Sequence, residues 1–481
     1  MIRIDLAWIA AAVEGRLIGV NRTVDQVSTD TRNMPNGCLF IALKGPNFDA
    51  HDFASQAIRD GAAAVMVERE LSAEDCDGAP QIIVADTRHA LGLLGAAVKA
   101  KVAPKTIAIT GSSGKTTVKE MLAAILRKQG EVLATAGNFN NDIGVPLTLL
   151  RIEPHHQFAV IELGANHLGE IAYTTRLTQP DVAIINNVAP AHVEGFGDIH
   201  GVYRAKSEIF RGLGPHGLAL TPFHSDFAQG WAQQLSGVHH ETFGRAPEDA
   251  QQPQPTVRAR NISVDEQGCA EFDVELGGAT PQQAHIKLSL PGLHNVDNAL
   301  VAIRAAVAVG CALTDAQTAL AELTPVAGRL HVIRLNDHIR LIDDSYNANV
   351  GSVKAALDML AAYPGYRMMV LGDMGELGSQ AREYHEEVGA YAIKAGIDNL
   401  YTAGVLSQSA SEVFNGRGGR HFSAIEGLVE AIIATVKQAQ APITILVKGS
   451  RSARMERVIE ALQHRQEELQ PMTPKEGKHA C

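Results

Sequence analysis

The sequence has few cysteines, and they are scattered along the chain. Five occur in 481 residues, with no C-x-x-C spacing among them: Cys38, Cys76, Cys269, Cys311 and Cys481. An odd number at these separations excludes a disulfide framework and a zinc site built on thiolates. We therefore expect reduced thiols and a cytoplasmic protein.

Surplus positive charge and long apolar runs are also missing. Lys and Arg number 42 against 53 Asp and Glu, which gives a formal net charge of −11. This balance excludes a general nucleic-acid-binding or anionic-membrane surface, so an anionic ligand must be held by a local pocket. No run approaches the roughly 18 apolar residues of a membrane span. At the N-terminus, Asp5 and Glu14 interrupt a run in which Leu6, Ile9 and Val13 have helical spacing, which predicts an amphipathic helix and not a signal peptide.

The length and the order of apolar runs predict an α/β protein of three domains. Residues 1–103 alternate short strands with helical stretches and end in a Lys/Pro cluster that marks a hinge. Residues 104–324 read as a parallel sheet with crossover helices, with an antiparallel excursion at 246–290. Residues 325–481 repeat strand, loop and helix as a doubly wound, Rossmann-like domain.

One junction points directly to a ligand. Residues 106–120 read TIAITGSSGKTTVKE, an apolar strand that enters a glycine loop and then a helix. Such a junction points backbone N–H groups and the positive helix end at one spot, where phosphate binds. The spacing is close to G-x-x-x-x-G-K-[ST], with Ile109 in place of the first glycine. The alternative is a glycine turn with a solvated lysine. We expect a nucleotide site at Gly111, Ser112, Ser113, Gly114, Lys115, Thr116 and Thr117.

Polar residues follow other apolar strands of the central domain. Glu162 ends the strand in VIELGA, where its carboxylate could reach a Mg²⁺ ion held by Thr116; a solvated carboxylate is the alternative. His192 lies in the loop after the next strand and Lys206 on the helix beyond, and spacing alone is also compatible with structural roles for both.

Two further positions in this half of the chain are candidates. Asn295 and Asn298 share one helix face, and their amides could match an adenine edge or simply cap the helix. Arg329 in AGRL could clamp a phosphate from across the domain junction, or could be an ordinary surface arginine.

Three polar loops follow strands of the last domain. They are IDDSYNANVG, VLGDMGELG and VKGSRSARM, and because they follow parallel strands we expect them to meet at one sheet edge as a ligand face. Turn chemistry alone is the alternative for each. The candidate residues are Asp343, Asp344, Ser345, Tyr346, Asn347, Asn349, Asp373, Glu376, Lys448, Ser450 and Arg451.

Taken together and in this order, TGSSGKTT, VIELGA, NNVAPAHVEGFG with AKSEIF, HNVDNALVA, AGRL and DDSYNAN resemble the Mur ligase family over essentially the whole chain. The resemblance implies an ATP-dependent amide ligase of peptidoglycan precursor synthesis, which works through an acyl phosphate. DSYNAN, LGDMGELG and KGSR further imply that D-alanyl-D-alanine is joined to a UDP-N-acetylmuramoyl-tripeptide.

The resemblance also implies roles for single residues. Lys115, Lys206, His192 and Arg329 would be catalytic, and Asn295, Asn298 and Asp343 would contact the adenosine of ATP. Two Mg²⁺ ions are expected, one at Thr116 and Glu162 and one at His192 and a carbamylated Lys206. Substrate contacts are expected from Ser28, Thr31, Arg32, Lys44, Asn138, Asn140, Asn141, Tyr346, Asn347, Asn349, Asp373, Lys448, Ser450 and Arg451.

The three domains would then bind the UDP-sugar, ATP and the dipeptide in turn, and we expect a monomer. Two segments depart from the family pattern: Val350 and Gly351 follow NAN where a proline is common, and D-A-H at residues 49–51 replaces D-G-H. Another Mur-type ligase that adds a single amino acid, a folate-polyglutamate type enzyme, and a P-loop ATPase switch are the alternatives.

Overall fold

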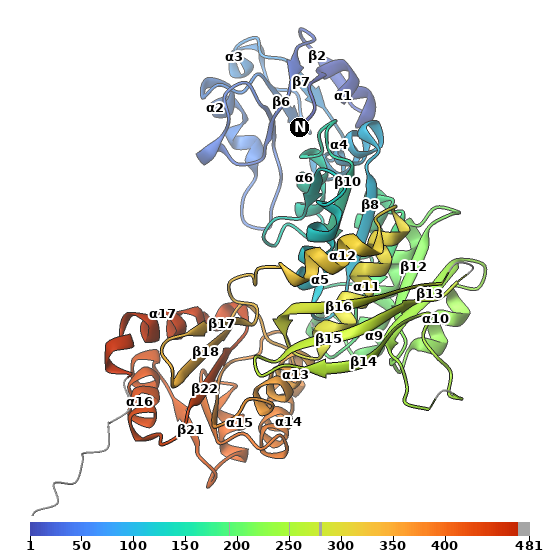
Figure 1. Cartoon of the computed structure of the whole chain (residues 1–481). Helices are drawn as coiled ribbons and strands as arrows, with labels where there is room; N and C mark the ends of the chain where they lie inside the picture. Colours follow the sequence, from blue (N-terminus) through green and yellow to red (C-terminus); the bar gives the residue numbers. More distant parts are fainter. Residues whose placement is uncertain (192, 250, 279–280, 470–481) are drawn as a thin grey trace, which may run out of the picture.

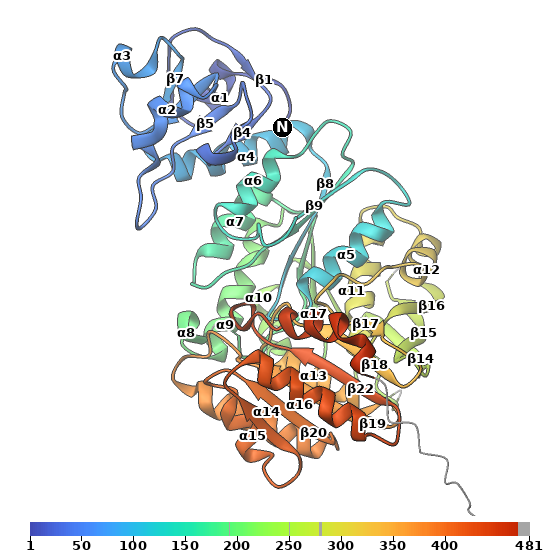
Figure 2. The same cartoon turned by 90° about the vertical axis from the view of Figure 1, so that its left-hand side faces the viewer.

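The computed structural model describes residues 1–191, 193–249, 251–278 and 281–469. Within these ranges the chain forms three open sheets, each with its own helices, and a short two-stranded ribbon. Figures 1 and 2 show the N-terminal unit (blue) and the C-terminal unit (orange to red) at opposite ends of the central unit. None of the helices in the described ranges is long and apolar enough to cross a membrane.

The N-terminal unit is built on a sheet of short strands, with β2 antiparallel to β7 and the other pairs parallel. Its order is β2 (Arg16–Ile18), β7 (Gln81–Ile83), β6 (Ala64–Val67), β5 (Leu39–Ile41) and β4 (Val27–Ser28), beside the ribbon of β1 (Ile4–Asp5) and β3 (Thr23–Val24). The helices are α1 (Leu6–Ala12), α2 (Ala54–Arg59), α3 (Ala73–Cys76) and α4 (Thr87–Val102). Helix α1 is the predicted amphipathic helix, with Leu6 and Ile9 buried.

The central sheet is parallel from β9 to β14 and then turns antiparallel, as the alternating pattern of residues 246–290 predicts. Its order is β16 (Gln282–Pro291), β15 (Cys269–Leu276), β14 (Val257–Val264), β13 (His239–Arg245), β12 (Leu218–Pro222), β11 (Val182–Ile185), β8 (Lys105–Thr110), β10 (Phe158–Glu162) and β9 (Val132–Ala134). The helices are α5 (Lys115–Leu126), α6 (Gly144–Leu150), α7 (Glu170–Thr178), α8 (Val193–Phe196), α9 (Ile199–Ser207), α10 (Ala228–Gln234), α11 (His294–Ala308) and α12 (Leu313–Ala321).

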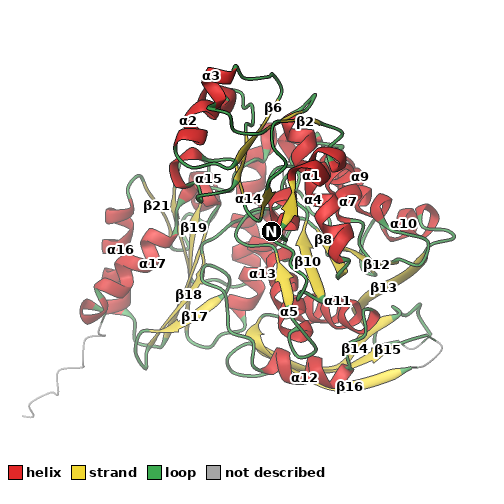
Figure 3. Cartoon of the chain, turned by 90° about the horizontal axis from the view of Figure 1, so that it is seen from above, coloured by secondary structure: helices red, strands yellow, loops and turns green. Residues whose placement is uncertain are grey.

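Alternate residues of the central strands face two separate cores. Ala108 packs toward α7 and α9, whereas Ile107 and Ile109 pack toward α5 and α11. Figure 3 shows these helices on the two sides of the sheet. Because both faces are covered, β8, β10 and β11 read as continuous apolar runs, and only their carboxyl ends are open to a ligand.

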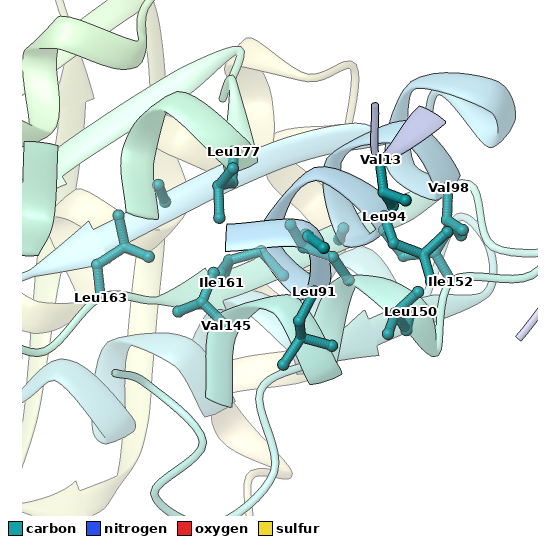
Figure 4. Packing of buried hydrophobic residues seen from close by; sticks show 14 of the residues in the cluster. Val13, Leu91, Leu94, Val98, Val145, Leu150, Ile152, Ile161, Leu163 and Leu177 are labelled. Carbon is teal, nitrogen blue, oxygen red and sulfur yellow. The ribbon is translucent and has the colours of Figure 1, made fainter. Parts of the chain in front are cut away.

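Helix α4 joins the N-terminal unit to the central one through a shared apolar core. Leu91, Leu94 and Val98 of this helix lie in the same cluster as Val13 of the N-terminal unit and Val145 of α6 (Figure 4). The predicted hinge after residue 102 therefore begins at the end of a helix that is already packed on the central unit.

The C-terminal unit is a parallel sheet with one antiparallel edge strand, which the apolar runs did not predict. Its order is β17 (His331–Arg334), β18 (Ile339–Asp344), β22 (Ile443–Lys448), β19 (Tyr366–Gly372), β20 (Asn399–Ala403) and β21 (Gly419–Phe422). The helices α13 (Val350–Ala361), α14 (Ala381–Lys394) and α15 (Gln408–Val413) cover one face, and α16 (Ile425–Gln438) and α17 (Glu456–His464) cover the other. This is the predicted doubly wound arrangement.

The C-terminal unit contacts the central unit at several points. Tyr363 donates a hydrogen bond from its hydroxyl to the main-chain oxygen of Gln267, at 2.6 Å. At the start of α13, a Cβ built on Gly351 would lie 3.2 Å from the Cβ of Ala189. The residue that departs from the family pattern here is thus one that allows close approach. The loop before α13 is held by a capping box between Asn349 and Ser352.

Candidate active site

The glycine loop between β8 and α5 is built to leave donors free for an anion. Gly114, the N-cap of α5, has φ +74°, and a Cβ there would lie 2.6 Å from Nδ2 of Asn186, so only glycine fits. Asn187 accepts the Ser113 N–H at 2.9 Å, and the Lys115 ammonium donates to the Gly111 oxygen at 2.8 Å. The start of α5 is therefore an organised phosphate site.

Thr116 and Glu162 are side by side, as the metal-site hypothesis requires. The Thr116 hydroxyl donates to Oε2 of Glu162 at 3.0 Å, and the Asn140 amide donates to Oε1 at 2.9 Å. Glu162 is only 3% exposed. A hydroxyl and a buried carboxylate that face a phosphate loop are ligands that suit Mg²⁺, which prefers oxygen and keeps phosphate and water in its shell.

Among the described residues there is no cluster of three or more His, Cys, Asp or Glu side chains that could hold a metal alone. This agrees with an ion whose remaining ligands come from phosphate and water. His192, predicted for the second ion, lies outside the described residues.

Lys206 lies in the same cavity and is 1% exposed. Burial lowers its pKa to about 7, and the nearby charge of Lys115 acts in the same direction. Burial also lowers the pKa of Lys115. A lysine with this pKa has a substantial neutral fraction near pH 7, which is the form that reacts with CO₂.

Asn295 and Asn298 line the cavity and are already linked to each other and to the phosphate loop. Asn298 donates to the Asn295 side-chain oxygen at 2.8 Å and accepts from Asn186 at 2.9 Å, while Asn186 also donates to the Ser113 oxygen. Each amide keeps hydrogen-bonding capacity beyond these contacts, so adenine recognition stays a prediction.

Residues of the C-terminal unit close the cavity from the opposite side. Tyr346, Asn347, Asn349, Lys448 and Arg451 line it, as does Arg329. Lys448 is paired with Asp344 at 2.5 Å and also donates to the Asn347 oxygen. Burial raises the pKa of Asp344. The cavity volume is about 510 Å³, sufficient for a nucleotide.

Several predicted residues are not in the cavity lining. The Asp343 carboxylate accepts from Gly328 N–H and from Ser345, and the Asp373 carboxylate accepts the N–H groups of residues 405–407. Ser450 is hydrogen-bonded to the same loop through its N–H. The main-chain oxygen of Gly111 is the acceptor for Lys115. The roles predicted for these residues stay predictions.

The predicted UDP-sugar residues are also outside the cavity. Ser28 is buried and donates to the Asp30 oxygen, Arg32 is paired with Asp30 at 2.7 Å, and Thr31 opens the same short helical turn. Lys44 is exposed. In the loop before α6, Asn138 and Asn140 line the cavity, whereas Asn141 accepts the Gly144 N–H.

Sequence reasoning missed five residues that line the cavity: His224, Arg245, His294, Asp297 and Asp344 as a wall residue in place of its neighbour. Burial lowers the pKa of His294 to about 4 and raises that of Asp297, whose Oδ2 is 3.5 Å from Nε of Arg245. Asp297 lies between two asparagines that were singled out, and Arg245 ends a strand, so a helix-face or strand-end count could have found both.

Comparison with known proteins matches family models along most of the chain. The Mur ligase middle domain matches residues 109–306, the Mur ligase glutamate ligase domain matches 328–451, and the Mur ligase family catalytic domain matches 23–109.

Individual relatives match at full length. The UDP-N-acetylmuramoyl-tripeptide–D-alanyl-D-alanine ligase of Escherichia coli strain K12 is 47% identical over 96% of this chain and 99% of its own. A crystal structure of MurF from Acinetobacter baumannii has a TM-score of 0.89 at 36% identity, over 96% of this chain and 99% of that one. MurF ligase from Thermotoga maritima in complex with ADP has a TM-score of 0.79 at 27% identity, over 92% and 98%. On its motifs, its cavity and these matches, the chain belongs to the Mur ligase family.

Proposed function

We propose that this chain is an ATP-dependent ligase that joins D-alanyl-D-alanine to UDP-N-acetylmuramoyl-tripeptide in peptidoglycan precursor synthesis. The observation that carries the proposal is a single cavity that combines the phosphate loop of the central unit with Tyr346, Asn349 and Arg451 of the C-terminal unit. Full-length relatives with that activity in their names support the substrates, and the ADP complex of the Thermotoga relative supports the use of ATP.

The reaction has two steps. The terminal carboxylate of the tripeptide attacks the γ-phosphorus of ATP in line, so an O–P bond forms, ADP leaves and an acyl phosphate results. The neutral amine of the dipeptide then attacks the acyl carbon; the amide forms, inorganic phosphate leaves and the amine loses a proton. Lys115 and Arg329 neutralise charge on the transferring phosphoryl group, and the C-terminal unit keeps water from the acyl phosphate.

Two Mg²⁺ ions would supply charge neutralisation that the protein alone lacks. Thr116 and Glu162 would hold one, and His192 with a carbamylated Lys206 the other. The carbamate would convert a buried cation into an oxygen ligand, which the burial of Lys206 and the lowered pKa of its amine support.

We assign the three binding roles to residues 1–103 for the UDP-sugar, 104–324 for ATP and 325–481 for the dipeptide. Ser28, Thr31, Arg32 and Lys44 would contact the nucleotide-sugar, together with the 137–142 loop. The chain would act as a monomer in the cytoplasm, where ATP and a UDP-activated precursor are both available.

The decisive experiment is mass spectrometry of the product from UDP-N-acetylmuramoyl-tripeptide, ATP and a panel of D,D-dipeptides. We expect one dipeptide-extended product and phosphate release only when both substrates are present. Product with single amino acids would favour another Mur-type ligase. Phosphate release from ATP without either substrate would favour a P-loop ATPase switch.

A further inference from the structure

Arg329 precedes the first strand of the C-terminal sheet, but its turn is bound to the loop after β18. Gly328 donates its N–H to Oδ2 of Asp343 at 2.9 Å, and Tyr346 donates its N–H to the Gly328 oxygen at 3.1 Å. Gly328 has φ +76°, and a Cβ there would lie 3.1 Å from the Cβ of Tyr346. The turn that carries Arg329 therefore has one close fit on this loop.

The Tyr346 ring holds the guanidinium group itself. The Arg329 Cζ is 4.2 Å from the ring centroid, and the Arg451 Cζ is 5.9 Å from the same centroid. Arg329 makes no salt bridge within the part of the chain that the structure describes, whereas Arg451 is paired with Glu456. A ring face orients a guanidinium without neutralising it, so its full charge stays available for an incoming anion.

Asp343 is occupied by this turn. Its Oδ2 accepts from Gly328, its Oδ1 accepts from the hydroxyl of Ser345 at 2.5 Å and from the Ser345 N–H at 3.2 Å, and the residue is 7% exposed. The neighbouring Asp344 is the one that lines the cavity. A carboxylate with three donors in place has little capacity left for a ribose hydroxyl.

We propose that Asp343 and Tyr346 are positioning residues that seat Arg329: Asp343 holds the backbone turn, and Tyr346 holds the guanidinium in a charged, unpaired state above the nucleotide. This replaces a ribose contact for Asp343 and a substrate contact for Tyr346, and it rests on the proposed function, in which Arg329 neutralises the γ-phosphate. Arg329 then moves with the C-terminal unit, so its charge reaches the phosphate only when that unit is docked.

The test is a double-mutant cycle on the full-length enzyme, with Tyr346→Leu and Arg329→Ala measured separately and together. We expect Tyr346→Leu to lower kcat by roughly tenfold with little change in KM for ATP, because the seated charge acts on the transition state. In the Arg329→Ala background, Tyr346→Leu should cost no more than about twofold. Tyr346→Phe, which keeps the ring, should recover most of kcat. Equal losses in both backgrounds would show that Tyr346 acts through its own substrate contact and would overturn the proposal.

A second arm tests the backbone turn. Asp343→Asn places an amide against the Gly328 N–H or the Ser345 donors, so kcat should fall with the same dependence on Arg329, and KM for ATP should stay within about twofold. A large rise in KM for ATP with kcat preserved would indicate a ribose contact and contradict the assignment. Failure here is distinct from failure of the proposed function, because the wild-type enzyme must first yield the dipeptide-extended product by mass.

Discussion

Asn349, at the start of α13, donates a hydrogen bond from its side-chain amide to the main-chain oxygen of Ser112, at 3.0 Å. The two residues are 237 positions apart, and the bond joins the C-terminal unit to the phosphate loop. The same side chain caps α13 by accepting the Ser352 N–H at 2.9 Å. One residue therefore stabilises a helix and couples the docking of one unit to the geometry of the nucleotide site.

The two roles of Asn349 can be separated by substitution. Asn349→Ser keeps a good helix cap but cannot reach Ser112, so we expect KM for ATP to rise by about two- to tenfold with a small change in stability. Asn349→Ala should show the same rise in KM and an additional loss of about 1 kcal/mol in stability. Steady-state kinetics and thermal unfolding measure both; an unchanged KM in the two variants would refute the coupling.

The Thr116–Glu162 contact predicts the Mg²⁺ dependence. Thr116→Val removes the hydroxyl and Glu162→Gln removes the charge, so each should raise the Mg²⁺ concentration for half-maximal activity by roughly tenfold or more. Thr116→Ser keeps the hydroxyl and is the matched control. Activity is titrated with Mg²⁺ at saturating ATP, and identical titration curves for Thr116→Val and Thr116→Ser would place the ion elsewhere.

Lys206 predicts a dependence on carbon dioxide and pH. Its pKa of about 7 means that the amine becomes protonated as pH falls through 7, so carbamylation and activity should decline there and recover with added bicarbonate above pH 7. Lys206→Ala should cripple turnover, with partial rescue by short carboxylic acids. Unchanged activity in Lys206→Ala would rule out the carbamate.

His294 predicts part of the acid sensitivity of the fold. Burial holds its folded pKa at about 4, below the ordinary 6.5, so the unfolded state binds more protons between these values. Stability from this group is complete above pH 6.5 and is lost as pH falls toward 4, by up to about 3 kcal/mol. His294→Asn should show a smaller drop in melting temperature between pH 7.5 and 5 than the wild type. Equal drops would indicate that other groups set the slope.

The pair Arg304–Glu241 predicts a loss of stability that is separate from function. The guanidinium makes two hydrogen bonds to the carboxylate, at 2.6 and 2.7 Å, and the side chains are 14% and 10% exposed. Arg304→Met leaves Glu241 buried with its main partner removed, at a cost of about 3–5 kcal/mol, yet kcat of the folded enzyme should stay within about twofold. Arg382→Met breaks the exposed pair with Glu386 and should cost less than about 1 kcal/mol. Equal melting temperatures for the two variants would contradict this prediction.

The local elements were predictable because they depend on patterns along the chain. The glycine loop before Lys115, the apolar runs of β8, β10 and β11, and the alternation in β15 each record a backbone requirement or the burial of one or both faces. The antiparallel edge strand β17 was not predicted, since it is short and half-buried and its pairing with β18 is set by a turn.

Site residues were found where one residue type follows one strand, and missed where neighbours compete. Asp343 and Asp344 both follow β18, and the sequence does not say which faces the ligand, because a one-residue step turns a side chain to the opposite face of a strand. Likewise Arg245, His224 and Asp297 come from separate elements that only the central sheet brings together.

The sequence by itself determined the phosphate loop, the alternation of strands and helices, and the family, because these depend on local backbone chemistry and on motif order. Tertiary structure alone decided which side chains share the cavity: Asn349 against Ser112, Asp344 with Lys448, and Arg329 on Tyr346. These contacts depend on how separately folded sheets dock, and the free energy of docking is spread over many weak contacts between distant residues, so no local pattern records it.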